Sequence, residues 1–506
     1  MKSSRRLRPF PLRVLDAAAL LQRTRRDDPA SESLLRPSRT MNFADLRFWE
    51  CLLAALLVAA GFRSAFRGAA AVRDGRFDRW FLLILGLVLL GLVSWLTFVI
   101  HLGVAVFTFA CVAWGSRRPA AHGRWILAAV VPLQLLPLLY YKYADFLWRD
   151  VWGGAGWWTG TVAIPAGISF YTFQLVGFAV DTLIRREPLP RWFDFLNFAG
   201  FFPQIVAGPI ERRESLLPQI EGFRLRWSAA DIDAGFRWMA LGLFFKCALA
   251  DNLAAQFHRG PSTNAYQIWL ANGIFGLRIY YDFAGYSLIA VGIARCLGIR
   301  LSLNFLSPYC ATGPAEFWRR WHVTLSQWFR DYIYVPLGGG RGRGWAFNVA
   351  VVFLVSGIWH GAGWNFVLWG GLHALWLIAA RLTARVNVPA PLGWLGTVII
   401  AAFSWLFFYE TSPSVLWAKL ATLAQPAAYG PAALAALKAS FTAADLVTLG
   451  GTLGLCALTL LAEWRSLSRG GEPYSLLVRP WVLVVLVVLT VWLAPGDQND
   501  FIYFAF

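Results

Sequence analysis

Long apolar stretches alternate with short basic ones along most of this 506-residue chain. The hydrocarbon core of a bilayer is about 30 Å thick, and an α-helix needs roughly 20 apolar residues to cross it. Stretches of this kind predict membrane helices at 45–62, 80–114, 124–148, 345–359, 363–380, 394–409, 443–464 and 480–494. Four further stretches are less purely apolar, because they carry Gly, Tyr and isolated charges: 162–184, 191–210, 233–255 and 265–298. The pattern therefore predicts roughly ten to twelve helical passages, some of them short or broken.

The runs are uniformly apolar and do not alternate, so they predict helices and not the strands of a membrane barrel. Composition agrees, because 58% of the residues are hydrophobic and only 15% are charged, whereas soluble domains carry roughly 25% charged residues. The longest polar interval, 211–231, is too short to bury a core of its own. We therefore predict an all-α polytopic membrane protein with one integrated domain over residues 41–506.

The formal net charge of +18 lies largely in short loops, at 63–79, 117–124, 185–191 and 319–343. Arg-rich loops are retained in the cytoplasm. Because these loops alternate with spans, they argue against a nucleic-acid surface and fit anionic membrane lipid or an anionic cytosolic substrate. The six cysteines lack CxxC spacing and are interpreted as small buried hydrophobes.

Residues 1–40 differ from the rest of the chain in composition. They carry ten Lys or Arg against four Asp or Glu and contain no spanning stretch. The basic loop after the first span should be cytoplasmic, which places residue 41 outside, and an Arg-rich extension would resist translocation. Met41 opens an apolar run typical of a membrane-protein start. We therefore expect residues 1–40 to result from a start codon assigned too early, with a disordered cytoplasmic tail as the alternative.

One charged and aromatic segment, EFWRRWHVTLSQWFRDYIYVPLGG (316–339), stands out from the apolar background. An apolar stripe recurs every three or four positions and predicts one continuous amphipathic helix: Phe317, Trp321, Leu325, Trp328 and Tyr332. A polar ridge recurs in the same way on another face: Arg319, His322, Ser326 and Arg330. An interfacial anchor would explain the tryptophans and the arginines. It has no use for an imidazole aligned with two guanidinium groups, so His322 is a candidate functional residue.

A second constellation, VVFLVSGIWHGAGWNFVLWGGLHALW (351–376), places His360 at the end of an apolar span beside Gly357, Gly361 and Gly363. Glycines there let the helix break and let another backbone or a ligand approach closely. An ionisable residue at membrane depth marks a functional site by default; the alternative is an imidazole that bonds a backbone carbonyl at a helix end. His373 either supports His360 or fills a packed polar site. The remaining histidines have no such context, and no role is assigned to them: His101, His122 and His258.

These residue types suit general acid–base chemistry. A neutral imidazole suits general-base work near neutral pH, and a hydroxyl that attacks a thioester must lose its proton as the C–O bond forms. Arginines and backbone donors can hold the phosphates of a carrier and the developing negative charge. The chain has no GxSxG elbow, no HExxH motif and no Cys/His cluster, so neither a serine nucleophile nor a metal site is predicted. The turn PLGGGRGRG (336–344) lacks the GK[ST] of a phosphate loop.

The two constellations resemble the membrane-bound O-acyltransferase (MBOAT) family, in its bacterial alginate O-acetyltransferase-like branch. Further stretches extend the resemblance over nearly all of 41–506: IPAGISFYTFQLVGFAVD (164–181), FFPQIVAGPIERRESLLPQI (201–220), YYDFAGYSLIAVGIARCLGIRLSLNFLSPY (280–309) and FIYFAF (501–506). It implies a helical membrane fold around a central funnel that joins the cytosolic and outer faces.

The resemblance also implies roles for individual residues. His360 matches the essential membrane-embedded histidine of the family, and His322 matches a second polar position that is Asn in many relatives of other branches. Both are therefore expected to be catalytic. The substrate-binding residues, mainly on the donor side, are expected to be Arg319, Arg330, Ser326, Trp321, Asn365 and His373. No metal and no tightly bound cofactor is expected, since the donor is a substrate: acetyl-CoA or another acyl thioester.

The expected activity is transfer of an acetyl group across the bacterial inner membrane for O-acetylation of an exopolysaccharide. The expected partners are a periplasmic or membrane-anchored SGNH-hydrolase-like acetyltransferase, a polysaccharide biosynthesis complex and membrane lipid. The sequence does not identify the acceptor polymer, which could be alginate, cellulose or another secreted glycan.

The chain departs from its relatives at Leu288, where polysaccharide-acetylating members often carry an acidic residue, although Asp282 is retained. Three alternatives stay open. A transporter or channel could use the basic loops and a histidine proton relay, but the chain shows no related halves. A non-catalytic scaffold could recruit a periplasmic acetyltransferase. A third possibility is transfer of D-alanine to a cell-wall polymer.

Overall fold

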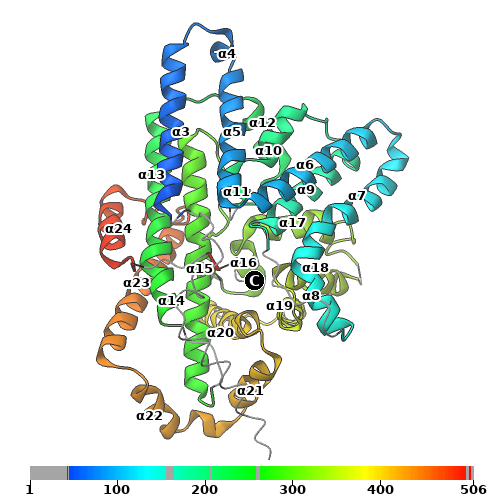
Figure 1. Cartoon of the computed structure of the whole chain (residues 1–506). Helices are drawn as coiled ribbons and strands as arrows, with labels where there is room; N and C mark the ends of the chain where they lie inside the picture. The colour runs from blue at the N-terminus through cyan, green and yellow to red at the C-terminus, as the bar shows by residue number, and fades with distance from the viewer. Residues whose placement is uncertain are drawn as a thin grey trace, which may run out of the picture. The chain divides into compact units, whose positions relative to one another are not determined.

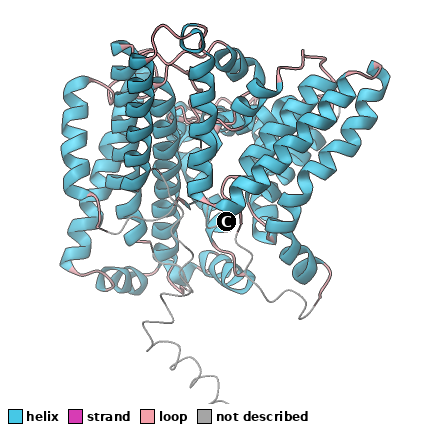
Figure 2. Ribbon diagram, turned by 45° about the horizontal axis from the view of Figure 1, so that its top comes forward, coloured by secondary structure: helices cyan, strands magenta, loops and turns pink. Residues whose placement is uncertain are grey.

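The computed structural model describes residues 43, 45–154, 164–205, 208–257, 262–342, 344–496 and 501–502. Within these ranges the chain consists of helices, turns and loops, without a β-strand (Figure 2). The all-α prediction is therefore confirmed for the described part. Residues 1–40 lie outside it, so the predicted extension and its boundary stay predictions.

The first part of the chain forms helices in the region of the predicted spans 45–62 to 124–148. Their bounds are α3 (Leu46–Ala65), α4 (Ala70–Arg73), α5 (Arg76–Val93), α6 (Trp95–Ser116), η1 (Ala120–His122), α7 (Gly123–Leu138), η2 (Leu139–Tyr143), α8 (Ala144–Phe146) and η3 (Leu147–Val151). The next group is α9 (Ile168–Leu183), α10 (Trp192–Ala199), α11 (Phe202–Ile205), α12 (Arg213–Glu221), α13 (Ala229–Leu243), η4 (Phe244–Ala250), α14 (Asp251–Ala255) and α15 (Ala265–Cys296).

The second part of the chain carries both histidine constellations. Its helices are η5 (Pro308–Cys310), α16 (Pro314–Arg320), α17 (Val323–Phe329), η6 (Arg330–Tyr334), α18 (Trp345–His360) and α19 (Trp364–Leu382). The chain then continues through α20 (Ala390–Tyr409), α21 (Pro413–Leu423), η7 (Pro426–Tyr429), α22 (Pro431–Ala439), α23 (Ala443–Ser468) and α24 (Pro480–Leu493).

Seven helical segments in the described residues are long and apolar enough to cross a membrane: Leu46–Ala65, Trp95–Ser116, Ala120–Val151, Ala229–Ala255, Trp364–Leu382, Ala390–Tyr409 and Ala443–Ser468. Three shorter apolar helices accompany them: Ile168–Leu183, Trp345–His360 and Pro480–Leu493. The number of passages, predicted as roughly ten to twelve, stays a prediction, as does the central funnel.

Two predicted passages are each divided into two helices. The stretch 80–114 contains most of α5 and most of α6, because Ser94 takes an extended conformation and its hydroxyl accepts a hydrogen bond from the Thr97 amide (3.3 Å). Serine at such a position caps a new helix and satisfies its first backbone donors. The stretch 191–210 contains only the short helices α10 and α11, with Gly200 between them. Neither break changes the apolar composition, which is why hydropathy did not reveal it.

Two glycine pairs bring α13 and α15 into close contact along their length (Figure 1). A Cβ on Gly242 would lie 2.7 Å from the Gly285 carbonyl oxygen, and one on Gly235 would lie 2.7 Å from the Gly292 carbonyl oxygen. Both pairs are seven residues apart on each helix, and their order is antiparallel. Small residues at this spacing let membrane helices approach backbone to backbone. This close packing supports α15, whose Phe283 contacts His322.

Close contacts at glycines also join α18 and α19, the helices that carry His360 and His373. A Cβ on Gly357 would clash with the Phe366 carbonyl oxygen, and one on Gly370 would clash with the Phe353 carbonyl oxygen. The short connection 361–363 therefore turns the chain back so that α19 packs tightly along α18. The glycines noted in the sequence serve this packing as well as the helix end at His360.

Candidate active site

The segment 316–339 is not one continuous helix, so that prediction is wrong. Helix α16 ends at Arg320 and α17 begins at Val323, with Trp321 extended and His322 in the left-handed region (φ 41°, ψ 57°). The break is held by backbone hydrogen bonds to a neighbouring segment: the Val323 amide donates to the Asn304 carbonyl (2.8 Å), and the Arg320 carbonyl accepts from the Leu306 amide (2.9 Å). A non-glycine residue in this region is uncommon and is often found at functional sites.

The break divides the predicted polar ridge. The His322 side chain points into the protein and its residue is only 1% exposed, whereas Arg319 and Arg330 are exposed. Arg330 pairs with Asp331 (2.8 Å), and the Ser326 hydroxyl donates to the Trp321 carbonyl (3.2 Å). The shared ridge of His322 and the two arginines is therefore wrong, because it required an unbroken helix.

The arginine end of the segment forms an ion-pair network near its surface. Asp331 receives hydrogen bonds from Arg330 (2.8 Å) and Arg212 (2.9 Å). Partial burial raises the pKa of the Asp331 carboxyl, but the hydrogen bonds and the positive charge of the two arginines outweigh it, so the pKa lies below its ordinary value. Arg330 is therefore tied to an ionised carboxylate.

Aromatic rings surround the imidazole of His322. The ring centroids of Phe283, Trp359, Phe170 and Phe305 lie 4.7, 6.0, 6.1 and 6.4 Å from its own. Within the described residues neither ring nitrogen of His322 has a hydrogen-bond partner. Buried polar atoms of proteins are almost always hydrogen-bonded. A buried imidazole with two unpaired nitrogens is therefore suited to bind a polar group of a substrate.

His360 is the last residue of α18 and is 3% exposed. The rings of Trp359, Trp369 and Phe408 surround its imidazole, with centroid distances of 4.9, 4.9 and 5.3 Å. Gly361 follows with an extended backbone and ends the helix. The sequence predicted His360 at the end of an apolar span, and the structure confirms that position.

The two candidate catalytic histidines contact the same tryptophan. Trp359 lies 4.9 Å from the His360 ring and 6.0 Å from the His322 ring, centroid to centroid. Among the described residues, His322, Lys142 and His373 carry ionisable groups close enough to act electrostatically on His360. These residues come from η2, the break between α16 and α17, α18 and α19, and sequence spacing alone could not have shown that they lie close together.

Lys142 is a functional candidate that the sequence reasoning missed. Its ammonium group donates hydrogen bonds to the carbonyl oxygens of Trp359 (2.8 Å) and His360 (2.9 Å). The neighbouring Tyr143 hydroxyl donates to the Ile358 carbonyl (2.7 Å). Both belong to the π-helical turn η2. Turns of this kind are rare in proteins, and those that occur are frequently found at functional sites. The signal was present, since a lysine inside the apolar stretch 124–148 is an ionisable residue at membrane depth.

His373 is buried on α19 beside the same aromatic group. Its ring lies 4.7 Å from Trp369 and 4.9 Å from Trp318, and neither ring nitrogen has a hydrogen-bond partner within the described residues. Because Trp369 also contacts the His360 ring, His373 lies one aromatic side chain away from His360. The structure thus brings together His322, His360 and His373.

Asn365 and Trp321, both predicted to bind substrate, make contacts that join parts of the protein to one another. The Asn365 side-chain amide donates to the Phe407 carbonyl (2.9 Å) and so joins α19 to α20. Trp321 is buried, stacks on Phe317 (5.6 Å) and packs against Trp405 (5.0 Å). Their assignment to substrate binding, like that of Arg319, stays a prediction.

Comparisons with known proteins show the family to which the chain belongs. A sequence model described as "MBOAT, membrane-bound O-acyltransferase family" matches residues 157–416, which include His322, His360 and His373. The chain is 34% identical over 339 residues to "Probable alginate O-acetylase AlgI" of Pseudomonas aeruginosa, and this match covers 62% of this chain and 64% of that protein.

Two further relatives have similar scores. The chain is 31% identical to "Peptidoglycan O-acetyltransferase" of Helicobacter pylori, over 60% of this chain and 66% of that protein. It is 33% identical to "Probable alginate O-acetylase AlgI" of Azotobacter vinelandii, over 66% and 69%. The chain thus spans 64%, 66% and 69% of the length of these three relatives. With its apolar helices and this match, the chain is a multi-pass membrane protein and belongs to the membrane-bound O-acyltransferase family.

Proposed function

We propose that this chain is a membrane O-acyltransferase that uses His360 as its general base. The acceptor hydroxyl donates its proton to the imidazole while its oxygen attacks the carbonyl carbon of an acyl thioester. The carbon–sulfur bond then breaks, and the departing thiolate takes the proton from the imidazolium. An imidazole is suited to this exchange because its ordinary pKa lies near neutral pH.

The observation that carries the proposal is the way His360 is fixed. Its backbone ends α18, its carbonyl accepts a hydrogen bond from Lys142, and three aromatic rings enclose its side chain. A catalytic group held in one orientation avoids the entropic cost of finding it during the reaction. His322, which has two unpaired nitrogens next to Trp359, is proposed to hydrogen-bond the thioester carbonyl as negative charge develops on its oxygen.

We further propose acetyl-CoA or another cytosolic acetyl thioester as the donor, and a secreted or cell-surface polysaccharide as the final acceptor. The names of the relatives support this choice, since the three described above are named for O-acetylation of alginate or peptidoglycan. Transfer across the inner membrane to an SGNH-hydrolase-like partner of a polysaccharide biosynthesis complex completes the proposal.

The test compares a strain that lacks the gene with strains that carry the wild type or His360→Ala. The measured quantity is ester-bound acetate, released by mild alkali from the extracellular and cell-wall glycan fractions and identified by NMR of the intact polymer. We expect the wild type to restore acetate and His360→Ala to leave none, at equal amounts of membrane protein. Release of D-alanine instead of acetate would assign the other acyl group to the chain.

His122→Ala is the matched control, because it is the same substitution at an exposed histidine of η1. It should restore the wild-type acetate content. Full acetylation by the His360→Ala strain would remove the imidazole from the mechanism and leave the scaffold interpretation.

A further inference from the structure

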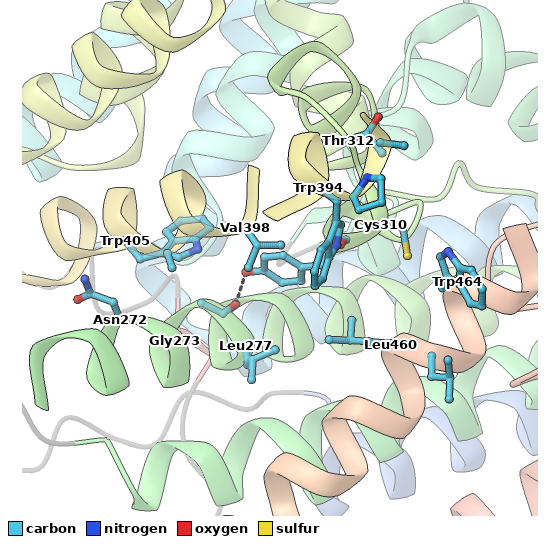
Figure 3. A pocket seen from close by; sticks show the side chains of 16 residues that line it. Asn272, Gly273, Leu277, Cys310, Thr312, Trp394, Val398, Trp405, Leu460 and Trp464 are labelled. Atoms are coloured by element: carbon cyan, nitrogen blue, oxygen red, sulfur yellow. Dashed lines mark hydrogen bonds between the residues drawn. The ribbon is translucent and has the colours of Figure 1, made fainter. Parts of the chain in front are cut away.

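An apolar cavity of about 650 Å³ lies between α15, α20, α23 and the loop around η5 (Figure 3). One wall is α15, where Gly273, Gly276 and Leu277 face the cavity. The opposite wall is α20, with Trp394, Val398 and Trp405. The other described lining residues are Asn272, Tyr309, Cys310, Thr312, Ala390, Pro391, Ala402, Leu460, Leu461 and Trp464.

None of the sixteen described lining residues carries a charge. Most polar groups among them are engaged within the protein; the Asn272 amide nitrogen and the Trp405 indole nitrogen have no hydrogen-bond partner within the described residues. The Tyr309 hydroxyl donates to the Gly276 carbonyl (2.6 Å), and the Trp394 indole donates to the Tyr309 carbonyl (2.9 Å). The Asn272 side-chain oxygen accepts from the Tyr409 hydroxyl (2.9 Å). The cavity therefore presents a surface of low polarity, which favours hydrocarbon over a polar ligand.

The cavity is continuous with the surface that faces the bilayer. Trp394 on α20, and Leu461 and Trp464 on α23, line it and are also largely exposed. Both helices are long and apolar enough to cross a membrane, so the solvent outside their exposed faces is lipid hydrocarbon. A lipid chain can enter such a cavity sideways without meeting water or a charged group.

We propose that this cavity binds one acyl chain of a membrane phospholipid. The exposed lining residues Trp394 and Trp464 lie on two candidate membrane helices, and Gly273 of α15 leaves room for the chain along that wall. Gly273 shows the room directly, because a Cβ added to it would meet no atom within 4 Å.

The bound chain would lie against a wall that the histidine site shares. Trp405 lines the cavity, and its ring also packs on Phe408 (5.5 Å) and on Trp369 (6.5 Å), two of the rings around His360. Trp321, next to His322, contacts Trp405 at 5.0 Å. The lipid chain would thus lie against Trp405, which in turn contacts the rings around His360 and the Trp321 next to His322. The proposal concerns binding and does not rest on the proposed function.

The experiment uses the full-length protein in bilayer nanodiscs that contain phosphatidylglycerol with a diazirine in the middle of one acyl chain. Light converts the diazirine to a carbene that inserts into neighbouring bonds, and peptide mass spectrometry locates the adducts. We expect adducts on the cavity-lining parts of α15, α20 and α23. They should exceed those on the equally apolar, exposed residues Val491 and Trp492 of α24.

Gly273→Leu fills the cavity from one wall without a backbone clash and should abolish the adducts on the lining. Gly103→Leu on α6 is the matched control. A Cβ at Gly103 also meets nothing within 4 Å, and the residue is exposed and outside the cavity. Its adduct pattern should equal that of the wild type. Unchanged labelling of the lining in Gly273→Leu would overturn the proposal.

Two further outcomes decide cases that Gly273→Leu alone would leave open. If that variant does not fold, Ala402→Phe fills the same cavity from α20 and should give the same loss. Lining adducts in the wild type that do not exceed those of α24 would show that this surface receives lipid only as every exposed helix does.

Discussion

The imidazole of His322 meets the ring of Phe283 edge to face, with the two ring centroids 4.7 Å apart and the planes at 85°. This contact depends on the left-handed backbone of His322, because that conformation turns its side chain from the exposed to the buried side of the segment. The position therefore has two requirements, one of the backbone and one of the side chain, and substitutions can separate them.

We expect His322→Asn to keep part of the activity, because Asn tolerates the left-handed region and retains a hydrogen-bond donor and acceptor. His322→Gly accepts the backbone more readily still but lacks a side chain, and it should be folded and inactive. His322→Leu should lose both. Activity is measured as acetate incorporated into polymer per unit of membrane protein. Wild-type activity of the Gly variant would show that only the backbone matters.

Lys142→Met should lower turnover by up to about 100-fold. The substitution removes the two hydrogen bonds that hold the carbonyl oxygens of Trp359 and His360, and also a positive charge at the C-terminal end of α18. The apparent affinity for the donor should change little, since the loss concerns the orientation of the base. Tyr143→Phe loses the bond to the Ile358 carbonyl (2.7 Å) and a longer one to the Trp359 carbonyl (3.4 Å) but leaves the His360 carbonyl bonded to Lys142, so it should have a smaller effect.

Steady-state kinetics with purified membranes and labelled acetyl-CoA separate the two parameters for these variants. A rise in KM without a fall in kcat for Lys142→Met would mean that Lys142 binds the donor. Equal activity of the Lys142→Met and wild-type proteins would show that the aromatic rings alone hold the helix end.

Arg319→Ala tests whether an exposed arginine beside the site binds the phosphates of the donor. Arg319 is exposed at the end of α16, so its removal should leave folding unaffected. We expect a higher apparent KM for the donor and an unchanged kcat, with the difference shrinking as salt concentration rises. Arg341→Ala, another exposed arginine in the same basic region, serves as the control. An unchanged donor dependence would exclude this role for Arg319.

Lys246→Met should destabilise the protein by about 3–5 kcal/mol. The Lys246 ammonium pairs with Asp251 and Asp282 at 2.8 Å each, and all three side chains are buried. Removing the cation leaves two carboxylates in a medium that cannot solvate them. A lower midpoint of thermal unfolding in detergent and a lower yield would report the effect. Arg76→Ala, which breaks an exposed pair with Asp74, should not shift the midpoint.

Long uniform apolar runs were sufficient to predict most of the helices. The stretches 345–359, 363–380 and 394–409 correspond to α18, α19 and α20 within a few residues. The breaks were not predictable in the same way. In 316–339 the helical period of apolar residues continues across Trp321 and His322. The helix is broken there by backbone hydrogen bonds with Asn304 and Leu306, which lie outside the segment and so do not appear in its pattern.

The candidate site was predictable in its parts but not in its assembly. A histidine at the end of an apolar span identified His360, and an imidazole in a charged helix identified His322. The Trp359 indole contacts both imidazole rings because α16–α17 packs beside α18. The sequence carries no signal for this packing. Lys142 obeys the same rule, since it is a charged residue within an apolar run. Its hydrogen bonds to the end of α18 span 217 and 218 residues of the chain, so the sequence does not place it at this site.

The carbonyl oxygens of Ile358, Trp359 and His360 are all taken by side chains of η2. Helix ends of this kind ordinarily attract any donor that comes near, because their last carbonyls lack partners. These three carbonyls already accept a hydrogen bond from the protein. In the mechanism proposed above, the acceptor hydroxyl would therefore meet less competition from the main chain when it donates to the imidazole of His360.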